Sequence, residues 1–107
     1  MSKIDYIKTS EIFKALSNPI RLQMVDFLLD DECCVTDVVN ELGISQSASS
    51  QHLLILKNSG IVYPEKHGTR TCYKVSNKLA EEIITLLKKF KNDLKHLTGN
   101  NAIRKND

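Results

Sequence analysis

Residues 42–53 read LGISQSASSQHL, and this stretch decides the fold. Gly43 is typical of the left-handed residue that ends a helix, and Ser45 is typical of the N-cap that starts the next one. That next helix is predicted to run until Gly60, and the helix before it is predicted to begin with Thr36 as its N-cap. Two short helices joined by a tight glycine-containing turn predict a helix-turn-helix.

Two further helices and a short strand are predicted before this unit. The apolar positions of residues 4–16 fit an amphipathic helix. Asn18 then predicts an N-cap and Pro19 the first turn of a second helix, which is largely apolar over residues 20–29. Residues 33–35, Cys-Cys-Val, predict one brief strand.

After Gly60 the pattern changes to that of a β-hairpin. Residues 61–63 and 71–75 are β-favouring runs, and residues 66–70 between them supply basic and turn-forming side chains. Pro64 places the first strand at a sheet edge or marks a bulge.

A last helix of about 20 residues, capped by Ser76 or Asn77, is predicted to close the chain. Its apolar positions are spaced three and four residues apart: Leu79, Ile83, Leu86, Phe90, Leu94 and Leu97. This spacing is close to a coiled-coil seam. The fold class is therefore mainly α with a small β-hairpin wing, a winged helix-turn-helix with an extra helix at each end.

Length and composition restrict the class of protein. A chain of 107 residues supports one domain, predicted over residues 1–98, followed by a polar and disordered tail over residues 99–107. A hydrophobic content of 41% and a charged content of 26% are ordinary for a globular protein. The sequence has no long apolar run and no secretory signal, so we expect a cytoplasmic protein without a membrane partner, with its three cysteines as reduced thiols.

The small net charge of +2 conceals an uneven distribution. Residues 1–44 carry a charge of −4, whereas residues 45–75 and residues 76–107 each carry +3. Positive charge in the middle of the chain is suited to a polyanion such as DNA.

The predicted helix after Ser45 begins with short or amide-bearing side chains and no carboxylate: Gln46, Ser47, Ser49, Ser50 and Gln51. Such side chains can donate to and accept from base edges and phosphates in a major groove. Lys66, Arg70 and Lys74 on the hairpin suit contacts with the flanking backbone. The same pattern also fits a capped, solvent-exposed helix, so the residues alone leave both interpretations open.

Three segments together resemble the ArsR-type (ArsR/SmtB, arsenical-resistance and metal-sensing) family of repressors. They are residues 13–22 (FKALSNPIRL), residues 42–53, and residues 67–75 of the hairpin. The resemblance implies a homodimer on a near-palindromic DNA operator, with the terminal helices at the interface; the predicted interface residues are Leu79, Ile83, Leu86 and Phe90. It also implies DNA contacts by Gln46, Ser47, Ser50 and Gln51 in the helix, although the family usually has His at the position of Gln51. Beside them, the charges of Lys66 and Arg70 in the wing predict phosphate contacts.

The inducer class is not settled by this resemblance. Zinc sensors of the family bind through the last helix, where this chain has Asn77, Leu79, Phe90 and Asp93, which cannot form a nitrogen-rich site. Residues 34–37, Cys-Val-Thr-Asp, match one thiol of the arsenic- or cadmium-type Cys-Val-Cys-Asp pattern. Residues 32–35, Glu-Cys-Cys-Val, resemble the persulfide-type Glu-Cys-Ser-Val pattern, but no cysteine lies on the last helix.

Strand geometry suggests another arrangement of the thiols. If the short strand pairs with the returning strand of the wing, Val35 and Tyr73 face the core while Cys34 and Cys72 point outward as cross-strand neighbours. Cys33, Cys34 and Cys72 are thus candidate sensors of oxidants, reactive sulfur species or a thiophilic metal or metalloid, with Cys34 and Cys72 as its ligands. Three cysteines without a function remain the alternative.

Enzymatic function is not expected. The chain has no glycine-rich phosphate loop, no paired acids and no Cys-x-x-Cys motif, so neither catalytic residues nor a cofactor is predicted. His52, His67 and His96 are dispersed and are expected to be exposed or close to DNA. The alternatives to a thiol-responsive repressor are a regulator without a thiol response and a small dimeric protein-interaction module.

Overall fold

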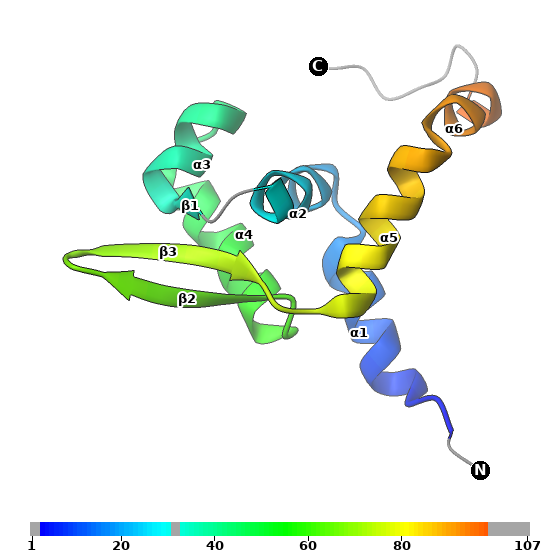
Figure 1. The fold of residues 1–107 in the computed structure, drawn as a ribbon, viewed down its shortest axis with the longest axis horizontal. Helices are drawn as coiled ribbons and strands as arrows, with labels where there is room; N and C mark the ends of the chain where they lie inside the picture. The colour runs from blue at the N-terminus through cyan, green and yellow to red at the C-terminus, as the bar shows by residue number, and fades with distance from the viewer. Residues whose placement is uncertain (1–2, 31–32, 99–107) are drawn as a thin grey trace.

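The computed structural model describes residues 3–30 and 33–98, so the predicted disordered tail lies outside the described residues. Within these described residues, nine elements follow one another (Figure 1). They are α1 (Tyr6–Leu16), α2 (Pro19–Asp30), β1 (Cys33–Cys34), α3 (Val35–Leu42), α4 (Gln46–Asn58), β2 (Val62–His67), β3 (Arg70–Val75), α5 (Lys78–Lys89) and α6 (Lys91–Thr98).

The N-terminal helices begin at side-chain caps. The Asn18 side-chain oxygen accepts the backbone N–H groups of Ile20 at 2.9 Å and of Arg21 at 3.1 Å, which confirms the predicted start of α2. The start of α1 was not predicted: Asp5 Oδ1 accepts the N–H of Lys8 at 3.0 Å and so begins the helix inside the apolar segment.

The helix-turn-helix forms where its capping residues predict it. Gly43 adopts φ 66° at the end of α3, and Ser45 Oγ accepts the N–H of Ala48 at 3.0 Å at the start of α4. The predicted N-cap of α3 is wrong by two residues, because Cys34 and not Thr36 occupies that position. Cys34 has the extended backbone of a sheet residue, and the Asp37 carboxylate accepts its N–H at 3.0 Å.

The strands form one antiparallel sheet in the order β1-β3-β2. The hairpin register runs from Val62 opposite Val75 to His67 opposite Arg70. Pro64 lies in β2, which is an edge strand as predicted, because a proline has no N–H for a second neighbour.

The single long terminal helix that the apolar spacing predicted is instead two helices. Phe90 ends α5 with φ −107° and ψ 23°, and α6 begins at the next residue. Lys88 and Lys89 lie in the last turn of α5, and Asp93 lies in the first turn of α6. The lysines favour the C-terminal end of one helix and the aspartate favours the N-terminal end of the next. The spacing of apolar residues carries no information on these charges and therefore did not predict the break.

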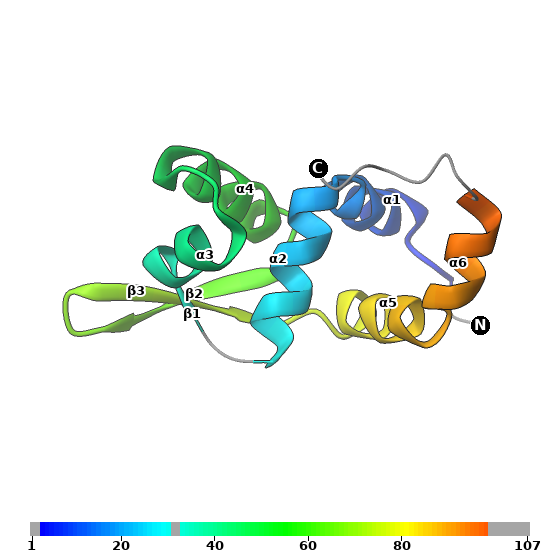
Figure 2. The ribbon, with the colours of Figure 1, turned by 90° about the horizontal axis from the view of Figure 1, so that it is seen from above.

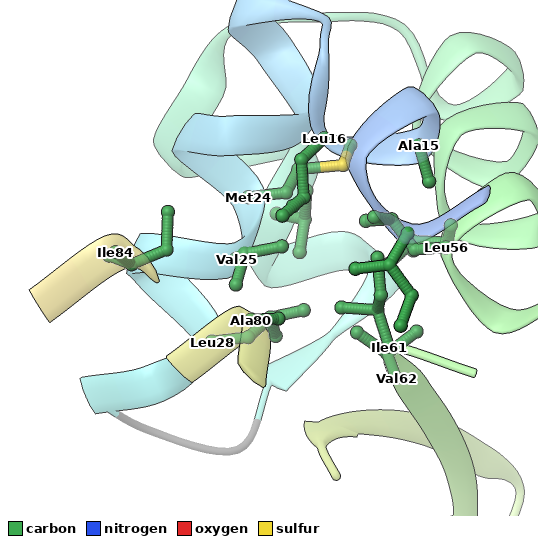
Figure 3. Close-up of a cluster of buried hydrophobic side chains, with 13 residues drawn as sticks. Ala15, Leu16, Met24, Val25, Leu28, Leu56, Ile61, Val62, Ala80 and Ile84 are labelled. Carbon is green, nitrogen blue, oxygen red and sulfur yellow. The ribbon is translucent and has the colours of Figure 1, made fainter. Parts of the chain in front are cut away.

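The hydrophobic core surrounds α2 (Figure 3). Met24 and Val25 of α2 are fully buried, together with Leu56 of α4 and Ala80 of α5. Outside the core, Lys88 Nζ lies 2.7 Å from Asp26 Oδ1 and joins α5 to α2; the hydrogen bond and charge of Asp26 raise the pKa of Lys88. Core packing thus joins α4 to α2, and both the core and the Lys88–Asp26 pair join α5 to α2.

The elements separate into two groups on either side of α2 (Figure 2). The helices α3 and α4 and the hairpin lie on one side, and α1, α5 and α6 lie on the other. The tip of the hairpin projects away from the terminal helices (Figures 1 and 2).

Candidate nucleic-acid interface

One face of α4 is polar and open to solvent. Gln46, Ser47, Ser50 and Gln51 are all exposed, and their spacing places them on one side of the first two turns. The first turn of α4 contains no acidic residue. The helix therefore presents hydrogen-bonding groups without a carboxylate that would repel phosphate.

The opposite face of α4 anchors the helix. Leu53 and Leu56 are buried, and Ser49, which the sequence grouped with the exposed polar residues, is fully buried as well. Ser49 lies one turn before Leu53, so the helical period assigns it to the buried face. The anchored face fixes which side chains α4 offers to a partner.

The hairpin contributes exposed cations, Lys66 and Arg70 close to its tip and Lys74 close to its base. Lys66, Arg70 and Lys74 are all exposed. Gly68, with φ 68°, forms the turn at the tip. Arg70 Nη2 lies 3.7 Å from Asp37 Oδ2, so the wing arginine is paired with α3.

His52 was expected to be exposed or close to DNA, and its proximity to DNA stays a prediction. It is half-buried, with Nδ1 3.3 Å from Nη1 of Arg21, whose Nε donates to the Ala15 carbonyl at 2.6 Å. An arginine only donates, so Nδ1 of a neutral His52 accepts this hydrogen bond. Desolvation, and then the charge of Arg21, lower the pKa of His52. Its position one turn after Ala48 gave no signal of this contact.

Two of the cysteines meet across the sheet. Cys34 of β1 pairs directly with Cys72 of β3, as strand alternation predicted, and a disulfide joins them with their Cα atoms 3.8 Å apart. The structure shows this pair as a disulfide, whereas reduced thiols were expected. Both cysteines lie outside the cluster around α2, consistent with the expectation that they point away from the core, but they are buried, with Cys34 5% exposed and Cys72 9% exposed. Alternation along β1 does not continue to Val35, which already belongs to α3.

The residue next to this pair, Cys33, lies opposite Tyr73 in the sheet. Val35 and Tyr73 are half-buried and pack against the core, as predicted. Within residues 3–30 and 33–98, no group of three or more His, Cys, Asp or Glu side chains could hold a metal ion. Asn77, at one of the positions that zinc sensors use, instead caps α5 by accepting the N–H of Ala80 at 2.9 Å.

The terminal helices expose large apolar side chains. Of the predicted interface residues, Leu79, Leu86 and Phe90 are exposed, whereas Ile83 is half-buried against the core of its own chain. The N-terminal segment adds four more exposed apolar residues: Ile4, Tyr6, Ile7 and Phe13. In the part of the chain that the structure describes, no helix has the length and hydropathy needed to cross a membrane.

Comparison with known proteins agrees with this geometry. A family model described as "Bacterial regulatory protein, arsR family" matches residues 18–63, from the cap of α2 into β2. An uncharacterised helix-turn-helix transcriptional regulator of Methanocaldococcus jannaschii is 40% identical over 83 residues, which cover 77% of this chain and 93% of that protein.

Two solved structures share the fold. Reduced HlyU from Vibrio cholerae is similar with a TM-score of 0.76 and 35% identity, covering 80% of this chain and 90% of HlyU. The transcriptional repressor PagR of Bacillus anthracis is similar with a TM-score of 0.72 and 29% identity, covering 77% of this chain and 94% of PagR. These similar proteins are regulators of transcription, not enzymes.

Proposed function

This chain belongs to the arsR family of bacterial regulatory proteins, and from its surfaces we propose that it is a homodimeric repressor that binds a near-palindromic operator. It binds DNA as a winged helix-turn-helix regulator of transcription. The observation that carries the proposal is the exposed, carboxylate-free face of α4 beside a basic hairpin. Occupation of an operator by such a dimer blocks transcription from it.

Base reading is assigned to α4. The side-chain amides of Gln46 and Gln51 reach base edges in the major groove. The short side chains of Ser47 and Ser50 allow the helix to approach the bases closely. Lys66 and Arg70 bind phosphates flanking the groove, and this part of the contact carries no sequence information.

The partner protomer covers the apolar side of the terminal helices. Ile7 is 76% exposed and Leu86 is 55% exposed in a single chain, which is costly in water for side chains of this size. A two-fold axis through α1 and α5 covers these residues and places two copies of α4 about one helical turn of DNA apart.

Release from the operator is assigned to a thiol-reactive inducer. The support comes from the buried Cys34–Cys72 pair at the boundary between α3 and the hairpin. A regulator that lacks such a response would bind the same DNA equally well in reducing and oxidising buffers.

DNA binding is tested with the full chain and a duplex selected from a random-sequence pool. The reduced protein should enrich one near-palindromic sequence, and its affinity for that duplex should fall steeply as salt rises from about 50 to about 200 mM. Failure to enrich any sequence, together with weak salt dependence, contradicts the proposal and favours a protein-interaction module.

The assignment of α4 is tested by the double variant Ser50→Ala with Gln51→Ala. Loss of base contacts should weaken specific binding by about 10- to 100-fold, since a good bidentate pair contributes about 1–3 kcal/mol, while the dimer stays intact. Gln23→Ala, an exposed glutamine of α2, is the matched control and should bind like the wild type. Equal affinity in the double variant would remove this face from base reading.

A further inference from the structure

The Cys34–Cys72 bond joins the two parts of the molecule that face the DNA. Cys34 is the N-cap of α3, the first helix of the helix-turn-helix, and Cys72 lies in β3, two residues after Arg70 of the wing. The bond therefore connects the helix-turn-helix to the hairpin through the paired strands β1 and β3.

The pair is buried apart from the core. Neither cysteine belongs to the hydrophobic core cluster around α2. On β3, alternation places Cys72 on the side of Arg70 and Lys74, which are both exposed. The two sulfurs are thus covered locally, and breaking their bond leaves the packing around α2 in place.

The same site binds the wing arginine. Asp37 Oδ2 accepts the N–H of Cys34 at 3.0 Å and lies 3.7 Å from Nη2 of Arg70. In the disulfide form, one carboxylate therefore contacts both the residue that carries the bond and the cation assigned to phosphate. A carboxylate beside Arg70 competes with DNA phosphate for that guanidinium.

From this arrangement we propose that Cys34 and Cys72 are a reversible redox switch, whose disulfide form binds the operator more weakly than the dithiol form. The inference rests on the DNA-binding function proposed above and specifies its regulation. The closed bond fixes the start of α3 to β3, so the hairpin cannot adjust its position against α4 when it meets DNA. It also keeps Arg70 next to Asp37.

The chemistry is a two-electron oxidation by a hydroperoxide. One thiolate attacks the peroxide oxygen, forming a sulfenic acid and releasing water or an alcohol after proton transfer. The second thiol attacks the sulfenic sulfur, the S–S bond forms, and water leaves. Cys34 is the better placed first nucleophile, because the N-terminal end of α3 favours a negative charge. The low exposure of both residues restricts the reaction to small oxidants.

The test uses the duplex selected by the reduced protein. Its affinity for the full-length protein is measured in excess dithiothreitol and again after stoichiometric hydrogen peroxide, with intact-mass analysis to show the loss of two hydrogen atoms. We expect the oxidised form to bind about 5- to 150-fold more weakly and dithiothreitol to restore the affinity. Equal affinity of the two forms overturns the switch and leaves the proposed DNA-binding function standing.

Variants of the cysteines assign the response to the pair. Cys34→Ala and Cys72→Ala should bind like the reduced wild type and should not respond to peroxide, and melting curves check that both fold. Cys33→Ala is the matched control, since it changes the adjacent cysteine and should retain the full response. Loss of the response in Cys33→Ala with retention in Cys72→Ala overturns the assignment.

Asp37→Asn tests whether Asp37 couples the redox state of the cysteine pair to Arg70 of the wing. The amide oxygen can still accept the N–H of Cys34, but the charge beside Arg70 is removed. We expect the oxidised and reduced forms of Asp37→Asn to differ less in their affinity for the selected duplex than the two forms of the wild type do. An unchanged difference would show that Asp37 takes no part in the switch.

Discussion

The base-reading side and the terminal-helix side of this molecule differ in how their apolar residues are covered. On the first side, Leu53 of α4 is 1% exposed and the outer face of the first two turns is polar, although Leu54 in the third turn is 54% exposed. On the second side, Leu86 of α5 is 55% exposed, and Leu79 and Phe90 are exposed as well. Packing within one chain fixes the polar face of α4, whereas we propose that a second chain covers the apolar surface of the terminal helices. A buried leucine of the first side therefore reports folding, and an exposed leucine of the second side is predicted to report assembly.

The largest effect is expected when a leucine of the first side is truncated. Leu53→Ala removes a buried side chain from the core cluster and leaves a cavity, which should lower the free energy of unfolding by about 2–5 kcal/mol. Leu54→Ala, at an exposed neighbour on the same helix, should change it by less than about 0.5 kcal/mol. Denaturant unfolding of the two variants measures the contrast, and similar losses would show that α4 has no distinct buried face.

A smaller effect, of a different kind, is expected on the second side. Leu86→Ala should leave the unfolding of the single chain nearly unchanged but should raise the dimer dissociation constant by about 10- to 100-fold, or about 1.4–2.7 kcal/mol. Sedimentation at several concentrations measures this. Glu81→Gln on the exposed surface of the same helix is the control. A variant that stays dimeric at every concentration would place the interface elsewhere.

The smallest expected effect is on the pH dependence of the free energy of unfolding. It concerns the contact of His52 in α4 with Arg21 in α2, the helix between the two sides. Because burial and Arg21 lower the pKa of His52 below its usual 6.5, the unfolded chain takes up a proton first as the pH falls below 6.5. The free energy of unfolding should therefore be fully present above pH 6.5 and decline below it, with a difference of less than one proton between the two states. His52→Gln should flatten this part of the curve. If the wild type and the variant lose stability in parallel, the contact contributes nothing.

The sequence predicted those parts of the fold that depend on neighbouring residues. Asn18, Gly43 and Ser45 act through their own backbone or through N–H groups two or three residues away, so their roles can be predicted from neighbouring residues. The break at Phe90 was missed because apolar spacing continues across it while the charges on either side favour two helix ends.

The candidate site, like the fold, was predictable where neighbouring residues determine the structure. The exposed residues of α4, and the burial of Ser49, follow from the helical period once the buried face is known. The half-buried position of His52 beside Arg21 does not, because Arg21 lies in α2, which is distant in sequence. Strand alternation predicted that Cys34 and Cys72 would be paired. It did not predict their burial, because that depends on where β1 ends and α3 begins.

The proline in β2 has a consequence for how copies of this protein meet. The hairpin projects from the body, and an outer strand with unpaired backbone groups is a template on which strands of other molecules can add. Pro64 removes one N–H from that strand, and Lys66 adds a charge to it, so strand addition is disfavoured. This protection of the outer strand is consistent with the proposed assembly through helices, and it guards the projecting hairpin against aggregation.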